Sequence, residues 1–433
     1  MGAQLDRGAG RRPELRGPLP GPRARDLIER DEHALSPSFT RSYPLVIDRG
    51  EGCWVTDVDG NVFLDLTAGI AVNVTGHSHP EVVAAVKAQA ERFLHMSGTD
   101  FYYWQEIELA ERLSRACLPE QDARVFFTNS GAEAIEGAMK LARYATQRPN
   151  YLAFLGAFHG RTLGALSLTA SKASQRQHFA PLLPSVYHAP YPSPSRNVST
   201  DDAMKRIEDL MTTVAPPTSI AAAFVEPIQG EGGYLVPPPD FLPRLRELTR
   251  RHGILLVVDE VQSGMGRTGR FLASEHSGIE PDIICLAKGI ASGLPLGAFI
   301  ARADLMNWAP GSHGSTFGGN PVACAAALAT LRLVQEGLTE NAERVGAHLM
   351  RRLMSLQAEY CMVVTDVRGM GLMLAVECTS GELAARAVEG AFQSGLLLLT
   401  AGTRAVRICP PLTLTEGEAD TAIDILRSVF ANL

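Results

Sequence analysis

The sequence lacks the features that mark membrane-spanning, secreted, disulfide-rich and nucleic-acid-binding proteins. No run among its 433 residues approaches the roughly 18 apolar residues of a transmembrane helix, and residues 1–25 contain no apolar segment of the kind that a secretory signal needs. The seven cysteines are never spaced C-x-x-C, and no spacing of the eleven histidines suggests a metal site. The net charge of −7 gives no reason to expect nucleic-acid binding. We therefore expect a cytoplasmic protein with reduced thiols, and without a metal, a membrane or a nucleic acid as partner.

What is present is the composition of an ordinary globular protein, long enough for about two or three domains. We expect residues 1–25, rich in Arg, Gly and Pro, to form a disordered arm. Residues 26–75 should carry a small antiparallel sheet that belongs to a smaller domain. In residues 76–325 short apolar runs alternate with helical patterns, which predicts a large domain of the α/β class with a mostly parallel sheet. Residues 326–433 then form a smaller α+β domain.

Two charged residues stand at the ends of apolar runs. Asp259 closes the run 253–259, and Lys288 follows the run 281–287. Both runs are β-branched and nearly free of charge, which predicts buried parallel strands, and ligands of open α/β sheets bind at the carboxyl ends of such strands. A carboxylate beside a pyridine nitrogen and a lysine that forms an imine are what pyridoxal phosphate requires. A structural ion pair between strand ends would explain the same two residues.

A predicted strand, a turn of small residues and a helix start follow one another around residue 130. Helix N-termini bind phosphate through backbone N–H groups and the helix dipole. Ser130 adds a hydroxyl there, Gly131 lets the backbone approach closely, and Ala132 opens the helix. An ordinary helix cap has the same composition. Thr316 offers another hydroxyl to a phosphate, just before a later helix.

Polar loops follow two further predicted strands. Phe158 can stack on a flat cofactor, and Arg161 can bind a carboxylate in a bidentate manner, although a core phenylalanine beside a surface arginine explains both. Glu226 stands at a strand end and Glu231 on a glycine-rich loop, where Glu231 can neutralise an arginine. A turn with one structural salt bridge is the alternative.

Val261 and Gln262 come directly after the Asp259 strand. Val261 can press on one face of a cofactor ring, and Gln262 can reach a phenolic oxygen. Each of the motifs described so far is weak alone. Their occurrence in one order, each after a predicted strand, makes them jointly strong.

At this point the chain resembles the class III pyridoxal-phosphate aminotransferases, the subgroup that holds 4-aminobutyrate, acetylornithine and ornithine aminotransferases. The resemblance runs from about residue 44 to the end of the chain. It rests on Thr75-Gly-His-Ser-His-Pro, Asn129-Ser-Gly-Ala-Glu-Ala, Phe158-His-Gly-Arg-Thr, Glu226-Pro-Ile-Gln-Gly-Glu-Gly-Gly, Asp259-Glu-Val-Gln, Ala287-Lys-Gly, Thr316-Phe-Gly-Gly-Asn-Pro, Arg368-Gly-Met-Gly and Arg407-Ile-Cys-Pro-Pro-Leu.

The resemblance implies fold type I, with a mixed, mostly parallel sheet flanked by helices, and a homodimer or dimer of dimers with shared active sites. Lys288 and Asp259 are the implied catalytic residues: Lys288 would hold the internal aldimine and Asp259 would pair with the ring nitrogen. The other implied cofactor-binding residues are Ser130, Gly131, Ala132, Phe158, His159, Val261, Gln262 and, from the neighbouring chain, Thr316. The implied substrate-binding residues are Ile70, Tyr102 or Tyr103, Arg161, Glu226, Glu231 and Arg407.

The implied reaction moves the ω-amino group of 4-aminobutyrate or of an ornithine-like donor to 2-oxoglutarate. The segment 101–104 resembles ornithine-type members, whereas 158–172 looks closer to 4-aminobutyrate-type members, so the donor stays open. The same frame carries amino-acid racemases, epimerases and aminomutases, against which Glu231 with Arg407 favours a transferase. A catalytically inactive binding protein is a third interpretation, and intact Lys288 and Asp259 argue against it.

Overall fold

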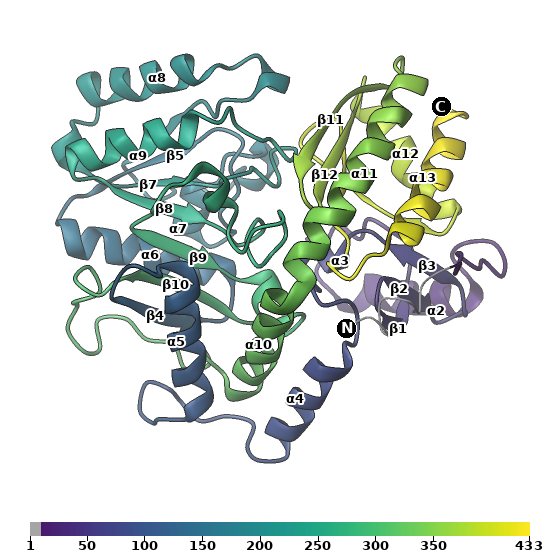
Figure 1. The fold of residues 1–433 in the computed structure, drawn as a ribbon, viewed down its shortest axis with the longest axis horizontal. Coiled ribbons are helices and arrows are strands. Elements are labelled where there is room, and N and C mark those ends of the chain that lie inside the picture. The colour runs from purple at the N-terminus through teal and green to yellow at the C-terminus, as the bar shows by residue number, and fades with distance from the viewer. Residues whose placement is uncertain (1–9) are drawn as a thin grey trace. The chain divides into compact units, whose positions relative to one another are not determined.

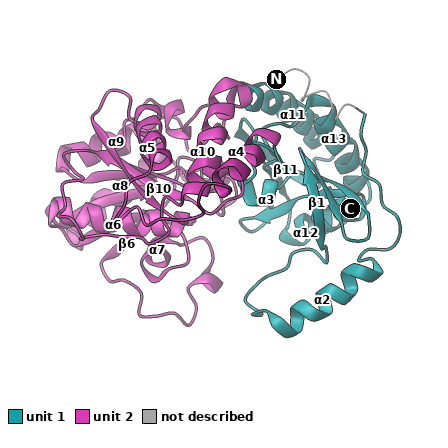
Figure 2. Cartoon of the chain, turned by 90° about the horizontal axis from the view of Figure 1, so that it is seen from below, with its two compact units in different colours: residues 1–79, 341–433 teal, residues 80–340 magenta. Residues whose placement is uncertain are grey.

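The computed structural model describes residues 10–433, and the first nine residues of the predicted arm lie outside the described residues. The chain divides into two compact units, one made of residues 1–79 and 341–433 and the other of residues 80–340 (Figure 2). The large unit therefore extends past the predicted boundary at residue 325. The reason is helix α10 (Pro321–Leu333), which packs against helices α4 (Pro80–Ala90) and α5 (Trp104–Cys117) of the same unit.

The large unit is built on a seven-stranded sheet with the order β4-β10-β9-β8-β7-β5-β6. All neighbouring pairs from β9 to β6 are parallel, and β10 runs antiparallel to both β9 and β4. The mixed, mostly parallel sheet predicted from the sequence is thus confirmed. The strands are β4 (Ala123–Thr128), β5 (Asn150–Phe154), β6 (Val186–Ala189), β7 (Ile220–Val225), β8 (Leu255–Asp259), β9 (Ile283–Leu286) and β10 (Gly297–Arg302).

Helices cover both faces of this sheet, because alternate residues of each strand point to opposite sides. Leu152, Ala223 and Leu256 pack with helices α8 (Thr200–Thr213) and α9 (Phe241–His252). Tyr151 and Ala222 pack on the other face, with α6 (Gly131–Thr146) and α7 (Leu163–Leu168). Figure 1 shows α8 and α9 together on one side of the strands.

The smaller unit contains two four-stranded sheets, with the orders β1-β2-β3-β13 and β11-β12-β15-β14. Their strands are β1 (Ile47–Glu51), β2 (Trp54–Asp57), β3 (Val62–Asp65), β11 (Val364–Met370), β12 (Met373–Cys378), β13 (Leu396–Leu397), β14 (Leu399–Ala401) and β15 (Ala405–Ile408). Its helices are α2 (Pro22–Ala34), α3 (Ala68–Ala71), α11 (Thr339–Glu359), α12 (Gly381–Gln393) and α13 (Glu416–Phe430).

Residues 10–25 have a defined position, which differs from the disordered arm that their composition predicts. Glu14 and Val62 exchange two backbone hydrogen bonds, with N···O distances of 3.0 and 2.8 Å. The carboxylate of Asp59 accepts the backbone N–H groups of Arg23 and Ala24, both at 2.9 Å, and so caps the start of α2. Local composition does not predict this order, because the residues that hold the segment lie 35 or more positions away in the sequence.

One continuous helical stretch in the described part of the chain, Pro321–Glu359, is long and apolar enough by composition to cross a membrane. Just over half of its most apolar window, 56%, is buried inside the protein. A core helix passes the same test of length and composition, so this stretch is weak evidence for a membrane span.

Candidate functional site

The predicted residues of the large unit gather at one edge of its sheet. Asp259 is the last residue of β8, Glu226 follows β7 directly, and Lys288 follows β9. The loop that carries Phe158 and Arg161 leaves the same end of β5. Because these strands are parallel, their carboxyl ends share an edge, which is where open α/β sheets bind ligands.

Asp259 and His159 form a buried pair at this edge. Oδ2 of Asp259 lies 2.7 Å from Nδ1 of His159, and Oδ1 accepts the N–H of Val261 at 3.0 Å. Burial acts to lower the pKa of His159, but the hydrogen bond to Asp259 and the charges of Asp259 and Glu226 outweigh it and raise that pKa. The imidazole thus orients one carboxylate oxygen of Asp259.

Glu226 is buried beside this pair and joins two loops. Its Oε2 accepts the N–H of Phe158 at 3.0 Å, and its Oε1 accepts the N–H of Gly230 at 3.1 Å. Burial raises the pKa of Glu226 to about 7, with His159 lowering it and Asp259 raising it further. Both carboxylate oxygens accept hydrogen bonds from backbone N–H groups. Glu226 therefore connects the loop after β5 to the loop after β7. Its contact with a substrate remains a prediction.

Helix α6 begins at the predicted phosphate cup. The hydroxyl of Ser130 accepts the N–H of Glu133 at 3.2 Å, and the Glu133 carboxylate in turn accepts the N–H of Asn129 at 2.7 Å. A Cβ atom at Gly131 would lie 2.8 Å from a methyl carbon of Val261, so only glycine fits without displacement. The first N–H groups of a helix have no partner within the helix, and here they open beside Val261.

Gln262 and Lys288 complete the cofactor side of the site. Gln262 is buried, and its Oε1 has no hydrogen-bond partner among residues 10–433. Such an orphaned amide fits a ligand oxygen once the amide is turned so that its NH₂ faces it. Lys288 has a φ of 45°, in the left-handed region, and backbone strain of this kind clusters at functional sites.

These features fit pyridoxal phosphate. Asp259 offers a buried carboxylate to a pyridine nitrogen, Gln262 an unsatisfied amide to the ring oxygen, and the start of α6 a set of N–H donors to the phosphate. Lys288 offers the amine at the carboxyl end of the neighbouring strand, β9. Each of these four groups matches one part of the cofactor.

The predicted carboxylate binder Arg161 is exposed, on the loop before α7. Its guanidinium carbon lies 5.7 Å from the centre of the Phe158 ring, so the two side chains that the sequence placed at the site are in contact. Glu231 is partly exposed and lies on the loop after β7.

The two tyrosines proposed for the substrate entrance differ in position. Tyr103 is only 7% exposed, and its hydroxyl donates to the carbonyl oxygen of Gly319 at 2.7 Å. Tyr102 is 96% exposed. Of the two, Tyr102 therefore presents its ring at the surface, whereas Tyr103 holds the loop that carries the exposed Thr316.

Arg407 and Ile70 belong to the smaller unit. Arg407 lies buried on β15, where its backbone pairs with Ala375 on one side and Leu399 on the other. Ile70 is 43% exposed, and its φ of 67° is unusual for a β-branched residue. Their predicted contacts with a substrate stay predictions.

Sequence reasoning missed the residues that hold the site loops in place. Thr169 accepts the N–H of His159 at 2.9 Å, and Gln229 donates to the carbonyl of Leu155 at 2.9 Å. Gln229 stands inside a motif that the sequence marks, so its involvement could have been suspected. Thr169 has no such signal, because it lies in an unremarkable stretch at the end of α7.

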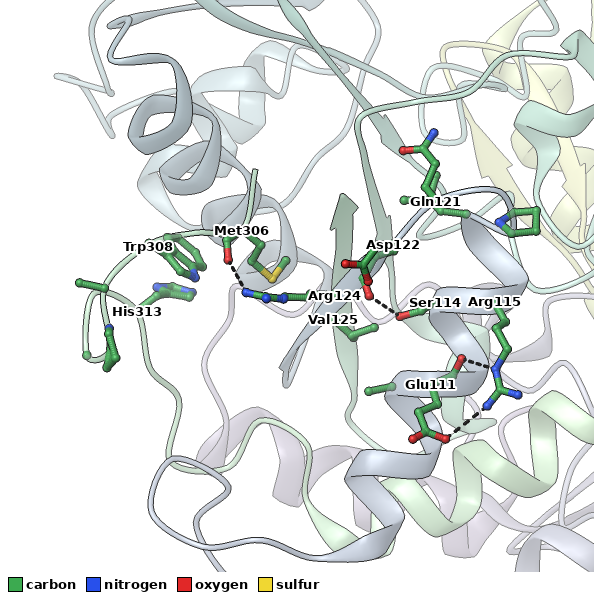
Figure 3. Close-up of a pocket in the computed structure, with 17 residues that line it drawn as sticks. Glu111, Ser114, Arg115, Gln121, Asp122, Arg124, Val125, Met306, Trp308 and His313 are labelled. Atoms are coloured by element: carbon green, nitrogen blue, oxygen red, sulfur yellow. Dashed lines mark hydrogen bonds and ion pairs between the residues drawn. The ribbon is translucent and has the colours of Figure 1, made fainter. Parts of the chain in front are cut away.

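A separate cavity of about 820 Å³ opens beside the edge strand β4 (Figure 3). Its lining includes Arg115, Arg124, Trp308 and His313, and none of the residues predicted for the site contributes to it. Arg124 donates to the carbonyl of Met306 at 3.3 Å across its wall. Although this cavity is large, it is separate from the site at the sheet edge.

Comparison with known families gives one match over most of the chain. The model of the family described as aminotransferase class-III matches residues 36–430.

Three curated relatives cover nearly the whole chain. An acetylornithine aminotransferase of Methanopyrus kandleri is 45% identical, over 92% of this chain and 97% of that protein. An alanine/serine racemase of Pyrococcus horikoshii is 41% identical, over 94% and 90%. A 4-aminobutyrate aminotransferase of Escherichia coli is 39% identical, over 94% and 98%.

Solved structures of transaminases share the fold. The ornithine aminotransferase of Toxoplasma gondii superposes with a TM-score of 0.86 at 33% identity, over 97% of this chain and 96% of that chain. An amine transaminase from an uncultivated Pseudomonas species, solved with pyridoxal phosphate bound, gives 0.85 at 33% identity, over 97% and 98%.

Proposed function

The chain belongs to the class III aminotransferases, and from this membership we propose that it moves the ω-amino group of 4-aminobutyrate, or of an ornithine-like donor, to 2-oxoglutarate. It is a pyridoxal-phosphate-dependent enzyme, as its family is. The observation that carries the proposal is the gathering of Lys288, Asp259 and Arg161 at one edge of one sheet.

The chain's own residues divide the work as follows. Pyridoxal phosphate, when bound, withdraws electrons from the substrate carbon that loses its proton. Asp259, oriented by His159, keeps a negative charge against the ring nitrogen and so favours its protonated form. Lys288 supplies the amine that binds the cofactor, and the same amine moves a proton at the substrate carbon.

Recognition of the substrate falls to charged side chains. Arg161 binds a carboxylate of the donor or of the oxo acid, because a guanidinium matches a carboxylate with two parallel hydrogen bonds. Arg407 binds the second carboxylate of an α-amino or α-oxo acid. Glu231 neutralises an arginine when the donor carries its amino group at the ω-position and brings no α-carboxylate. These three roles rest on the motifs and on the names of the aminotransferase relatives.

A half-reaction tests the proposed donor. Holoenzyme mixed with 4-aminobutyrate and no oxo acid should lose the absorbance of its lysine-bound cofactor in stoichiometric amount, and 2-oxoglutarate should restore it. The Lys288→Ala variant should show no turnover under the same conditions. An absorbance that stays constant with 4-aminobutyrate, with ornithine and with N-acetylornithine would refute ω-transamination.

A second candidate is an amino-acid racemase, which the racemase of P. horikoshii, at 41% identity, favours. Both reactions begin with loss of a proton from the carbon that carries the amino group, and they differ in the atom to which the proton returns. Chiral chromatography of L-alanine and L-serine incubated with the holoenzyme separates the two candidates. Formation of the D-amino acid without loss of the cofactor absorbance would support the racemase.

We also propose that two copies of the chain associate through an apolar surface of the large unit. It joins the segment 94–107 to the loop around Phe317, and His95 and Phe317 hold these segments together with ring centres 5.0 Å apart. An exposed apolar patch of this kind marks an interaction site. Its members, all at least 43% exposed, are Leu94, Met96, Phe101, Tyr102, Trp104, Ile107 and Phe317.

Size-exclusion chromatography with light scattering, which measures the molar mass of the eluting protein, would test this assembly. A dimer that Ile107→Glu and Phe317→Glu both weaken supports it, and a monomeric wild type contradicts it. The expected compartment is the cytoplasm, which imaging of the tagged full-length chain would check.

A further inference from the structure

Helix α6 provides a surface on which the Arg161 loop lies. Ala132 and Glu136 stand four residues apart and therefore face the same side of the helix. Gly160 approaches Ala132 so closely that a Cβ atom at Gly160 would lie 2.7 Å from the Cβ of Ala132. Thr162 lies against Glu136, one turn further along. Arg161 is thus the residue between two points at which the loop meets α6.

Glu136 holds the second of these points with several contacts. Its Oε1 accepts the hydroxyl of Thr162 at 2.6 Å and the backbone N–H of Ala165 at 3.1 Å. Gly164 passes so close that a Cβ atom there would lie 2.3 Å from Oε2. Three of the four residues that follow Arg161 therefore surround one carboxylate.

These contacts replace a local cap. Thr162 is the N-cap residue of α7, yet its side chain makes no capping hydrogen bond within that helix. The N–H of Ala165, which an N-cap side chain commonly satisfies, is bound by Glu136 of another helix. The start of α7, and with it the residue after Arg161, is consequently fixed to α6 and not to its own loop.

We propose that Glu136 is the positioning residue for Arg161, so that α6 sets the distance between the phosphate cup at its first turn and the guanidinium that binds the substrate carboxylate. This inference rests on the proposed function, since it assumes that Arg161 binds a carboxylate. Helix α6 is rigid over one turn. Both the phosphate cup at its start and Glu136, which holds the Arg161 loop, belong to this helix. The distance sets the length of substrate that reaches from the cofactor to Arg161.

A competing explanation is that Glu136 acts through its charge, by attracting the guanidinium of Arg161. Two variants separate the explanations. Glu136→Gln keeps an oxygen that accepts from Thr162 and Ala165 but removes the charge, whereas Glu136→Ala removes both. Thr162→Val deletes only one of the two hydrogen bonds. Glu111→Ala, on the exposed face of α5, is the control for loss of a carboxylate elsewhere.

The test uses the holoenzyme and glutarate, an unreactive dicarboxylate, in titration calorimetry. Glu136→Ala should weaken glutarate binding by about tenfold, the effect of losing one to two hydrogen bonds, while Glu136→Gln should stay within about threefold of the wild type. Thr162→Val should fall between them, and Glu111→Ala should match the wild type. In turnover, Glu136→Ala should raise KM for 2-oxoglutarate more than it lowers kcat.

Amide hydrogen exchange over residues 159–166 provides a readout that does not depend on activity. Exchange there should be faster in Glu136→Ala and close to wild type in Glu136→Gln. Wild-type affinity in Glu136→Ala, or equal losses in Glu136→Ala and Glu136→Gln, would overturn the inference. If the wild type binds no dicarboxylate, the proposed function falls, and unchanged exchange in Glu136→Ala would then overturn the positioning of the loop as well.

Discussion

Nδ1 of His159 lies 2.7 Å from Oδ2 of Asp259, and both side chains are almost fully buried although 100 residues separate them in the sequence. The loop after β5 thereby places a hydrogen-bond donor on the carboxylate at the end of β8, which we propose to face the cofactor ring.

Replacing His159 by Leu should lower kcat by about tenfold or more. The change removes a hydrogen bond to a charged group, which is worth enough to account for a factor of that size. Steady-state kinetics with the amino donor that the half-reaction identifies would measure this change in kcat. His33→Leu, on the exposed part of α2, is the control and should retain wild-type kinetics.

The Asp259→Asn variant should lose roughly 100- to 1,000-fold in kcat, the usual effect of removing one electrostatic group from a reaction site. An amide of the same shape cannot hold a negative charge against the ring nitrogen. The variant should still bind pyridoxal phosphate, as its absorbance would report. A near-native rate would remove Asp259 from the catalytic residues.

Glu226 should make the free energy of unfolding depend on pH between about 4.5 and 7. Its pKa is raised by burial to about 7 in the folded protein, against 4.5 for an ordinary glutamate, so the folded state keeps a proton that the unfolded state has lost. The contribution is therefore fully present below 4.5 and is lost as the pH rises through 7, by up to about 3 kcal/mol.

Urea unfolding of the wild type and of Glu226→Gln at pH 5 and pH 8, both saturated with cofactor, isolates this effect. The wild type should lose stability relative to the variant on going to pH 8. Since Glu106 also has a pKa raised by burial to about 7, the comparison uses the difference between the two proteins, in which Glu106 cancels. The same difference at both pH values would contradict the prediction.

Gly131→Ala should weaken the binding of pyridoxal phosphate by about tenfold or more. The new methyl group would lie 2.8 Å from a methyl carbon of Val261, so either the start of α6 or the Val261 side chain must shift. Fluorescence titration of the apoenzyme with cofactor measures the change. Gly417→Ala is a matched control in the first turn of α13, where an added Cβ meets nothing within 4 Å, and it should bind the cofactor normally.

The sequence predicted the strands that lie deepest in the sheet. Strands β7, β8 and β9 are buried along their whole length, so their apolar runs stand out without interruption. Strand β6 (Val186–Ala189) was missed because it lies at the sheet edge, and three of its four residues are only partly buried. An edge strand of this kind has no continuous apolar run.

The residues of the candidate site were predictable as far as they carry a motif. Asp259, Lys288 and Ser130 all lie where strand ends and a helix start had been expected. The contacts that fix their orientation were not predictable. The pairing of His159 with Asp259, and of Thr162 with Glu136, depends on how the loop after β5 folds back on the end of β8 and on helix α6, which spacing along the chain does not encode.

The hydrogen bonds between Glu14 and Val62 have a consequence for the solubility of the chain. They occupy the backbone N–H and C=O of Val62, at the end of β3 that precedes its pairing with β13. An open strand edge is a template on which another molecule can add a strand and begin to aggregate. The segment before α2 therefore covers this edge of β3. A shortened protein that begins after this segment would expose the edge to other protein molecules.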